Sequence, residues 1–167
     1  MIRLLLLRHA KAVGPSANDF ARVLALQGRD EAVAMANYLK TELLLPDLVL
    51  ASDAARTRET ANLAISALDK TPVQYEHAIY SGDMDVVLDL LHQTADSVKT
   101  LLVVGHNPTL HSLALELTGY GDRYAAQRMS SDFPTCCLAV LDFDVESWTQ
   151  VAARSGRLDR FIVLKPN

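Results

Sequence analysis

The chain contains little cysteine, little glycine and no excess of basic residues. Of its 167 residues two are cysteines and seven are glycines, and 20 acidic side chains outnumber 16 basic ones, for a net charge of −4. Cys136 and Cys137 are adjacent in a segment that we predict to be a strand, where neighbouring side chains point to opposite faces and pair poorly as a disulfide. This excludes a disulfide-rich scaffold. Because no basic stripe is present, we also expect no nucleic-acid partner.

Membrane-spanning hydrophobic runs are also missing. The apolar run at the start covers only residues 1–7, includes Arg3, and is followed at once by Arg8 and Lys11. A run of this length is too short to cross a bilayer, and it lacks the small-residue cleavage site of a signal peptide. We therefore expect a soluble cytoplasmic protein with no membrane partner.

The rest of the composition is that of a folded chain. Hydrophobic residues make up 50% and charged residues 22%, which excludes a disordered protein. A chain of this length can bury about two-thirds of its unfolded surface around one core, so we predict a single domain over residues 1–167. Metal-ligand spacings such as HExxH or paired CxxC are absent, as are the Walker and dinucleotide glycine patterns. We therefore expect neither a metal nor another cofactor.

Segments with strand and helix patterns alternate along the chain. The nearly continuous apolar runs are typical of parallel strands that are buried on both faces. The predicted strands are residues 2–7, 48–51, 73–75, 100–104, 136–143, 149–153 and 160–164. The predicted helices are residues 26–44, a helix capped by Ser52 or Asp53 that ends at residue 68, and residues 84–91 and 109–117. Residues 119–132 are predicted to be a loop. The alternation predicts an α/β fold, a three-layer α/β/α sandwich with a mostly parallel central sheet and some antiparallel pairing among the closing strands.

Two histidines stand where predicted strands end. His9 follows the first strand directly after Arg8, His106 follows a later apolar strand, and Arg56 opens the helix after the second strand. A single histidine at a strand end is more often a core or capping residue, but here two share the same placement. Ligands of open α/β sheets bind beyond the carboxyl ends of the strands. If the three strands are neighbours, these side chains form a pocket suited to a phosphoryl group, in which a histidine can attack phosphorus.

Three motifs resemble those of a known family. They are "LLLLRHAKA" at residues 4–12, "SDAARTRETA" at residues 52–61 and "LLVVGHNP" at residues 101–108. Together they resemble the histidine phosphatase superfamily, which has the phosphoglycerate mutase-like fold. The short chain, "RHAKA" and the segment "DFARVLALQG" are most similar to the SixA-type phosphohistidine phosphatases.

The resemblance implies a role for each matching residue. His9 is the expected nucleophile, Arg8 and Arg56 are expected to bind the phosphoryl oxygens, and His106 is expected to donate a further hydrogen bond. Arg22, in "DFARVLALQG", is a weaker candidate for substrate contact, with an exposed loop arginine as the alternative. These roles predict a phosphatase that works through a phosphohistidine intermediate and acts on phosphohistidine in a phosphorylated protein. The alternatives are a phosphatase of small phosphate monoesters and a catalytically silent module that binds phosphoproteins.

The chain departs from the family pattern at two places. Ala10 replaces the usual glycine of the opening Arg-His-Gly triplet. Residues 78–81, which we align with the usual position of the general acid, contain no carboxylate, and Glu76, Asp83 and Asp85 are only nearby. An alkoxide leaving group needs a proton donor, whereas the imidazole of a phosphohistidine leaves easily once protonated. The missing acid therefore favours a phosphoramidate substrate.

The other histidines match no catalytic pattern. His77 and His111 have no recognisable partner in the sequence, and His92 is expected to be a solvated residue at a helix end.

Overall fold

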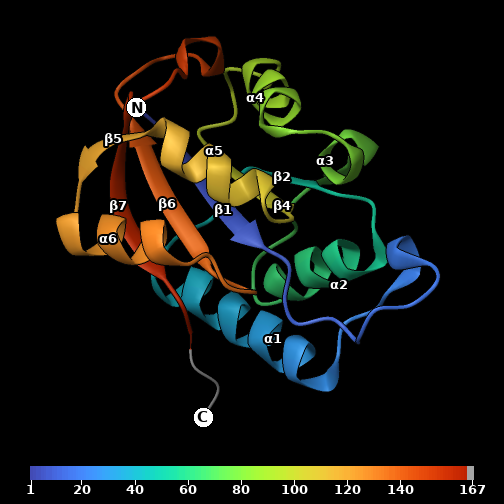
Figure 1. Ribbon diagram of the computed structural model, residues 1–167. Helices are drawn as coiled ribbons and strands as arrows, with labels where there is room; N and C mark the ends of the chain where they lie inside the picture. Colours follow the sequence, from blue (N-terminus) through green and yellow to red (C-terminus); the bar gives the residue numbers. More distant parts are fainter. Residues whose placement is uncertain (165–167) are drawn as a thin grey trace.

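The computed structural model describes residues 1–164, which form one seven-stranded sheet with helices on both faces (Figure 1). The strands are β1 (Ile2–Arg8), β2 (Leu48–Ala51), β3 (Val73–Tyr75), β4 (Thr100–Gly105), β5 (Thr118–Gly121), β6 (Leu138–Phe143) and β7 (Gly156–Ile162). The helices are α1 (Leu26–Thr41), α2 (Ala55–Ala64), α3 (His77–Ser81), α4 (Met84–His92), α5 (Thr109–Leu117) and α6 (Arg123–Ser131), with short 3₁₀ helices η1 (Asp19–Ala21) and η2 (Trp148–Gln150).

The sheet has the strand order β3-β2-β4-β1-β6-β7-β5. Strands β3, β2, β4 and β1 are parallel to one another, β6 is antiparallel to both β1 and β7, and β5 is parallel to β7. The predicted α/β/α sandwich with a mostly parallel sheet is therefore confirmed, and so is antiparallel pairing near the end of the chain.

Alternate residues of β1 contribute to two separate hydrophobic cores, as the two-residue period of a strand requires. Leu4 and Leu6 pack in the core under α3, α4, α5 and α6, whereas Leu5 and Leu7 pack in the core under α1 and α2. Covering both faces explains why this strand is apolar along nearly its whole length. None of the helices within residues 1–164 combines the length and hydropathy that crossing a lipid bilayer requires.

The predicted strand at residues 149–153 is wrong. The chain forms η2 there, because Ser147 and Gln150 make a capping box. The indole of Trp148 is fully buried and donates a hydrogen bond to the Val98 carbonyl at 2.7 Å. A local polar cap and one large buried side chain therefore override the apolar pattern.

Residues 119–132 are not the predicted loop. They contain most of β5 and all of α6, and the Asp122 side chain caps α6 by accepting a hydrogen bond from the Ala125 backbone. Helix bounds differ elsewhere as well: α1 ends at Thr41 and α2 at Ala64, each earlier than predicted. The start of α2 has no side-chain cap from Ser52 or Asp53.

The two cysteines lie just before β6 rather than inside a strand. Strand β6 begins at Leu138, and Cys136 has a positive φ of 58°, which is incompatible with the extended conformation of a strand. Both thiols are buried and free. The expected absence of a disulfide between them therefore agrees with the structure, although the predicted strand starts two residues too early.

Helix α1 approaches the segment after β1 very closely. The Ala25 backbone N–H donates to the Lys11 carbonyl at 2.9 Å. A Cβ atom at Gly28 would lie 2.0 Å from that same carbonyl oxygen. Only glycine permits this approach, so Gly28 helps to fix the backbone that follows His9.

Candidate active site

The ends of three neighbouring strands bring the two histidines together. Strand β4 lies between β1 and β2. The His9 backbone N–H donates to the Gly105 carbonyl at 3.0 Å, and the Ser52 N–H donates to the Val104 carbonyl at 3.0 Å. The residues that leave these strands therefore meet at one edge of the sheet, where the His9 and His106 rings lie 5.3 Å apart between centroids. The sequence-based expectation that the three strands are neighbours is correct.

His9 presents one unprotonated ring nitrogen. Its side chain is buried, with 8% of its surface exposed. Its Nδ1 lies 2.7 Å from the Ala10 carbonyl oxygen. A carbonyl can only accept, so Nδ1 carries the proton and donates it, and Nε2 keeps a free lone pair in the neutral ring. This is the tautomer that a nucleophile at Nε2 needs.

The surroundings of His9 keep its ring neutral. Burial lowers its pKa to about 4, and the positive charges of Arg56, Arg8 and Arg22 act in the same direction, against the hydrogen bond to Ala10. At neutral pH the side chain is therefore uncharged.

His106 is also neutral and is oriented by a serine. Burial, then the neighbouring His9 and Arg56, lower the pKa of His106 to about 3. Its Nε2 lies 2.7 Å from Ser52 Oγ, which itself accepts a hydrogen bond from the Ala54 backbone. With the Ser52 hydroxyl donating to Nε2, His106 carries its proton on Nδ1. That Nδ1 is buried without a partner among residues 1–164, so it can donate to an oxygen in the pocket.

Arg8 and Arg56 each have an unsatisfied buried donor. Arg8 Nη1 donates to the Phe133 carbonyl at 3.0 Å, and Arg56 Nη1 donates to the Asp19 carbonyl at 2.9 Å. The Nε atoms of both arginines are buried without an acceptor in the described part of the chain. Buried donors of this kind cost free energy until an acceptor arrives, and a phosphoryl oxygen is the acceptor that guanidiniums fit best.

Thr60 fixes the backbone that follows His9. Its hydroxyl donates to the Arg56 carbonyl at 2.7 Å and accepts the Ala10 backbone N–H at 3.0 Å. The motif at residues 52–61 thus has a structural reason: Ser52 orients one histidine, Arg56 supplies a donor, and Thr60 holds the turn next to the other histidine. Ala10 is fully buried, so a small side chain suffices where the family usually has glycine.

Asp19 belongs to the site, although only Arg22 of its segment "DFARVLALQG" was expected there from the sequence. Its Oδ2 accepts hydrogen bonds from Arg56 Nη2 at 3.1 Å and the Tyr80 hydroxyl at 2.9 Å, and its Oδ1 accepts one from Arg22 Nη1 at 3.0 Å. Hydrogen bonds from Arg22 and Tyr80, followed by the weaker effect of Arg56, lower the pKa of Asp19 to about 2. Asp19 is thus a permanent anion that orients Arg56 and cannot serve as a proton donor at neutral pH.

Arg22 lies at the rim of the site and binds its own loop. Its Nε and Nη2 donate to the Val13 carbonyl at 3.1 and 2.8 Å, and its Nη1 binds Asp19. Its charge nevertheless contributes to the low pKa of His9. Arg22 therefore supports the loop over residues 13–22, and its direct contact with substrate remains a prediction.

The nearby carboxylates face other parts of the surface. Asp83 caps α4 by accepting the Val86 N–H at 3.2 Å. Glu76 lines a hollow with Asp47, Gln74 and Leu90, away from the histidines. Asp85 is exposed. Within residues 1–164 none of the three acids makes a hydrogen bond to His9 or His106, and the missing general acid stays a prediction.

The other three histidines are placed differently from expectation. His77 does have a partner, since its Nδ1 lies 3.0 Å from both carboxylate oxygens of Asp53. His92 is not a freely solvated residue, because its Nε2 donates to the Val151 carbonyl at 2.8 Å. His111 donates to the Met129 carbonyl at 2.7 Å and stacks on a phenylalanine. Sequence alone could not reveal these pairs, since the partners are 18 to 59 positions away.

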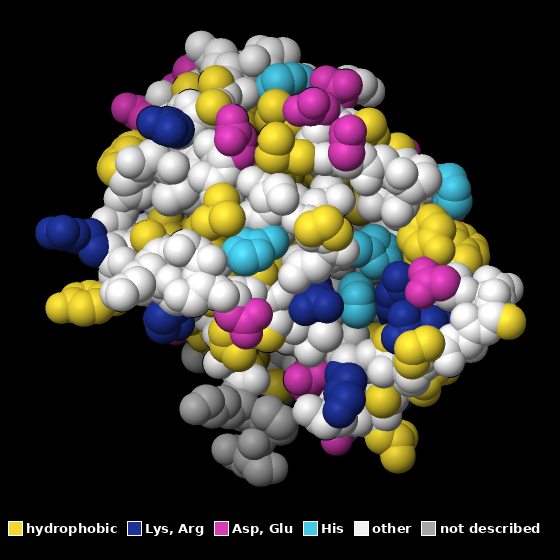
Figure 2. Space-filling view, viewed as in Figure 1, with side chains coloured by type: hydrophobic (Ala, Val, Ile, Leu, Met, Phe, Trp, Pro, Cys, Tyr) yellow, Lys and Arg dark blue, Asp and Glu magenta, His cyan; other side chains and the backbone are white. Residues whose placement is uncertain are grey.

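The surface view shows histidine side chains and Lys or Arg side chains close together on the face that is drawn (Figure 2). Histidines lie near the centre of this face, with dark blue basic side chains between them and a yellow hydrophobic patch at one edge. Within residues 1–164, no group of three His, Cys, Asp or Glu side chains is arranged to hold a metal ion.

Comparison with known proteins agrees with this arrangement of side chains. Residues 4–87 match the model of the histidine phosphatase superfamily, branch 1. The protein ML1117 of Mycobacterium leprae is 37% identical over 163 residues, which cover 94% of this chain and 99% of that protein.

Two solved structures are similar along nearly the whole chain. A candidate phosphohistidine phosphatase SixA from Agrobacterium tumefaciens superposes with a TM-score of 0.83 at 31% identity, covering 98% of each chain. The protein histidine phosphatase SixA in complex with tungstate superposes with a TM-score of 0.78 at 26% identity, covering 96% of each chain. The chain belongs to the histidine phosphatase superfamily. Within that superfamily it falls in the SixA-type branch, and its general activity is that of a phosphatase.

Proposed function

We propose that the protein removes the phosphoryl group from phosphohistidine in a protein, through a covalent intermediate on His9. The observation that carries the proposal is the set of unsatisfied donors around one free lone pair. Arg8 Nε, Arg56 Nε and His106 Nδ1 are buried without partners among residues 1–164. The His106 ring lies 5.3 Å from that of His9, and the charges of both arginines lower the pKa of His9, whose Nε2 is unprotonated. A dianionic phosphoryl group is the ligand that satisfies such donors.

In the first step His9 Nε2 attacks phosphorus. A bond forms between Nε2 and phosphorus while the bond between phosphorus and the substrate nitrogen breaks, and the leaving imidazole keeps the electron pair. When solvent has protonated the other nitrogen of that imidazole before the attack, the ring leaves as neutral imidazole. Arg8, Arg56 and His106 donate to the three equatorial oxygens, where the charge of the transition state is spread.

In the second step water attacks the phosphorylated His9. The new bond from oxygen to phosphorus replaces the bond to Nε2, which recovers its lone pair, and orthophosphate forms with the proton of water passing to an oxygen or to Nε2. The Nδ1–H bond to Ala10 is unchanged throughout, so the next cycle begins from the same tautomer.

The phosphoramidate substrate class is supported by the absence of a usable acid beside the histidines in the described part of the chain. Asp19 is the carboxylate that does reach the site. Its pKa is about 2, so at neutral pH it is ionised and has no proton to donate. Alkyl phosphates need such a donor, which contributes typically about 10²–10⁴-fold. Phosphohistidine does not need a donor on the protein once solvent has protonated its second ring nitrogen, because the ring then leaves as neutral imidazole.

A substrate panel tests the proposal. It compares kcat/KM for a phosphohistidine peptide, a phosphoserine peptide and a small alkyl phosphate. We expect the phosphohistidine peptide to be preferred by at least about 10²-fold, the lower bound for the missing acid. Efficient turnover of alkyl phosphates would instead identify a phosphatase of small monoesters.

Replacing His9, the proposed nucleophile, distinguishes a phosphatase from a protein that only binds phosphopeptides. His9→Ala should abolish turnover, while His92→Gln, a histidine substitution far from the site, should retain it. A rapid-quench experiment with radiolabelled phosphohistidine should label the wild-type protein at His9. A protein that binds the phosphopeptide but never becomes labelled is a silent binding module. Activity of His9→Ala above about a tenth of wild type, a barrier difference of about 1.4 kcal/mol, contradicts the nucleophile assignment.

A further inference from the structure

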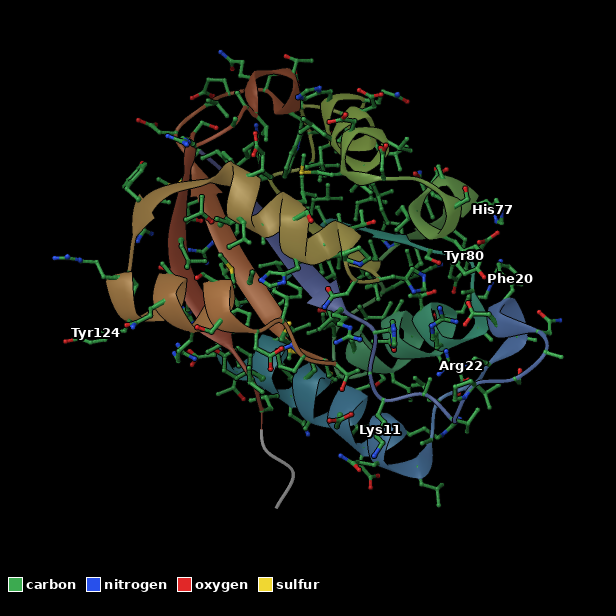
Figure 3. The ribbon with its side chains drawn as sticks, viewed as in Figure 1. Lys11, Phe20, Arg22, His77, Tyr80 and Tyr124 are labelled. Carbon is green, nitrogen blue, oxygen red and sulfur yellow. The ribbon has the colours of Figure 1, made fainter. Side chains whose placement is uncertain are left out.

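Three aromatic rings form a cluster at the rim of the site. Phe20 comes from η1, and His77 and Tyr80 come from α3. The Phe20 ring lies 5.0 Å from that of Tyr80 and 5.8 Å from that of His77, and the His77 and Tyr80 rings are 5.7 Å apart. Figure 3 shows the three side chains together on one side of the molecule, above Arg22. We refer to Phe20, His77 and Tyr80 as the aromatic rim.

The aromatic rim is connected to the catalytic groups through Tyr80. The Tyr80 ring meets the His106 ring edge-on, with centroids 5.5 Å apart, and the Arg56 guanidinium lies 5.9 Å from its centre. Its hydroxyl donates to Asp19, which in turn binds Arg56. The same ring that packs on the catalytic histidine therefore also packs on the two outer rings.

The outer rings are open to solvent. Phe20 is 37% exposed and the His77 side chain is 62% exposed, although such aromatic side chains are usually more deeply buried. Burying them elsewhere in the fold would be more favourable, so their exposure beside a polar pocket suggests a contact with a ligand.

The in-line geometry of the reaction determines where the leaving group goes. His9 is almost fully buried at the base of the pocket, and in-line displacement sends the leaving group to the side of phosphorus opposite Nε2. The aromatic rim, which is partly open to solvent and stands next to His106 and Arg56, is the part of the site that we place on that side.

We propose that the aromatic rim is a subsite for the leaving group, which receives the imidazole ring of the phosphohistidine by stacking against Phe20 and Tyr80. This inference rests on the function proposed above and specifies how the substrate is selected. Aromatic pairs favour offset or edge-to-face contacts at the distances already found among these three rings.

Charges around the rim suit the same ring. The Asp53 carboxylate contacts His77, and the Asp19 carboxylate contacts Tyr80. A phosphohistidine imidazole with a proton on its second nitrogen carries positive charge, which both carboxylates and the faces of the aromatic rings stabilise. The rim therefore favours the protonated form of the substrate, from which the ring departs without a further donor.

The test compares two substrates that share the phosphorus–nitrogen bond but differ in the ring. N-phosphoimidazole has an aromatic leaving group, and phosphoramidate has ammonia. Phe20→Leu and Tyr80→Leu should lower kcat/KM for N-phosphoimidazole by about fivefold, the size of an aromatic pair contribution, and should affect phosphoramidate at least about threefold less. Tyr80→Phe keeps the ring and should keep the preference for N-phosphoimidazole.

A matched control comes from an exposed ring elsewhere. Tyr124 lies on α6, on the other side of the molecule in Figure 3, and is 81% exposed. Tyr124→Leu should leave the kcat/KM for both substrates unchanged. Equal losses on both substrates in Phe20→Leu and Tyr80→Leu, or no loss at all, overturn the subsite, because the rings would then serve only to position Asp19 and the loop.

A second substrate pair separates failure of the subsite from failure of the proposed function. Phenyl phosphate and methyl phosphate differ in the ring but contain no phosphorus–nitrogen bond. If the wild-type protein does not act on phosphohistidine, the proposed function fails. A selective loss on phenyl phosphate in Phe20→Leu would still support the aromatic subsite, and its absence would overturn it.

Discussion

Arg56 makes several different contacts in the site in addition to its ion pair with Asp19. It binds both the backbone carbonyl and the carboxylate of Asp19, lies against the Tyr80 ring, and leaves Nε without a partner among residues 1–164. A planar guanidinium can do this because its donors point in fixed directions. The ammonium group of a lysine has the same charge but lacks the planar pair of N–H donors with fixed directions.

Arg56→Lys should therefore lower kcat/KM strongly. Removing one oriented donor to a transition-state oxygen costs about 10²-fold, and we expect a fall of that size here. Arg58→Lys is the matched control, since Arg58 is exposed on the same helix and stacks on Tyr75, 3.9 Å from its ring centre. Near-normal kinetics for Arg56→Lys would show that the reaction does not depend on the oriented guanidinium donors of Arg56.

Some residues of the site could be predicted from the sequence and others could not. His9, His106 and Arg56 could be predicted because each follows an apolar strand, a signal that is local in the chain. Asp19 and Tyr80 could not, because their contacts join residues 37 and 61 positions apart. The loop that carries Asp19 has no periodicity from which its path could be inferred.

At the level of secondary-structure elements, the acids near α3 and α4 have other contacts than the two histidines of the site. Asp83 is used as the cap of α4, and Glu76 faces a separate hollow. Glu76→Gln and Asp83→Asn should each leave phosphohistidine hydrolysis within a few-fold of wild type. Asparagine is itself a good cap, so Asp83→Asn should also fold normally. A fall of about 10²-fold in kcat/KM for either variant would identify that residue as a hidden proton donor.

The contact between α1 and the segment after β1 gives another prediction. Gly28→Ala should destabilise the protein by about 1–3 kcal/mol despite the better helix propensity of alanine, because its Cβ would collide with the Lys11 carbonyl. The free energy of unfolding in urea measures the effect. Gly14→Ala is the control, since no atom lies within 4 Å of the Cβ position there, and its unfolding free energy should change little. Equal stability of the two variants would mean that α1 can shift freely.

The elements themselves were predictable to different degrees. Strands β1 and β4 stand out because burial on both faces makes them apolar throughout. Helix α6 was missed because it is short and its buried residues are only Ala125 and Met129. Its clearest signal is the capping Asp122, which is easily mistaken for part of a loop.

At the scale of the whole molecule, burial of the two neutral histidines links folding to pH. Their pKa values fall from 6.5 to about 4 for His9 and about 3 for His106. Because the folded state disfavours protonation, the full stability is present above pH 6.5, and part of it is lost as the pH falls from 6.5 through 4. A tenfold difference in proton affinity between the folded and unfolded states corresponds to about 1.4 kcal/mol, so His9 alone accounts for at most about 3 kcal/mol.

Denaturant unfolding at pH 7 and about pH 4.5 measures this linkage. The wild-type free energy of unfolding should fall more between these pH values than that of His9→Gln, whose side chain cannot be protonated. The comparison between the two proteins cancels the titration of the carboxylates that they share. An identical loss in both proteins would contradict the low pKa of His9.

The position of β4 between β1 and β2 has a consequence for synthesis. The strands that carry His9 and precede Arg56 are made first, yet they do not pair with each other in the finished sheet. A nascent chain must be extended past residue 105 before the central strand can join them. At about 5–20 residues per second, the ribosome needs about 5–20 s to pass from the end of β1 to the end of β4. During this interval the growing polypeptide has no assembled pocket and cannot yet capture a phosphorylated partner.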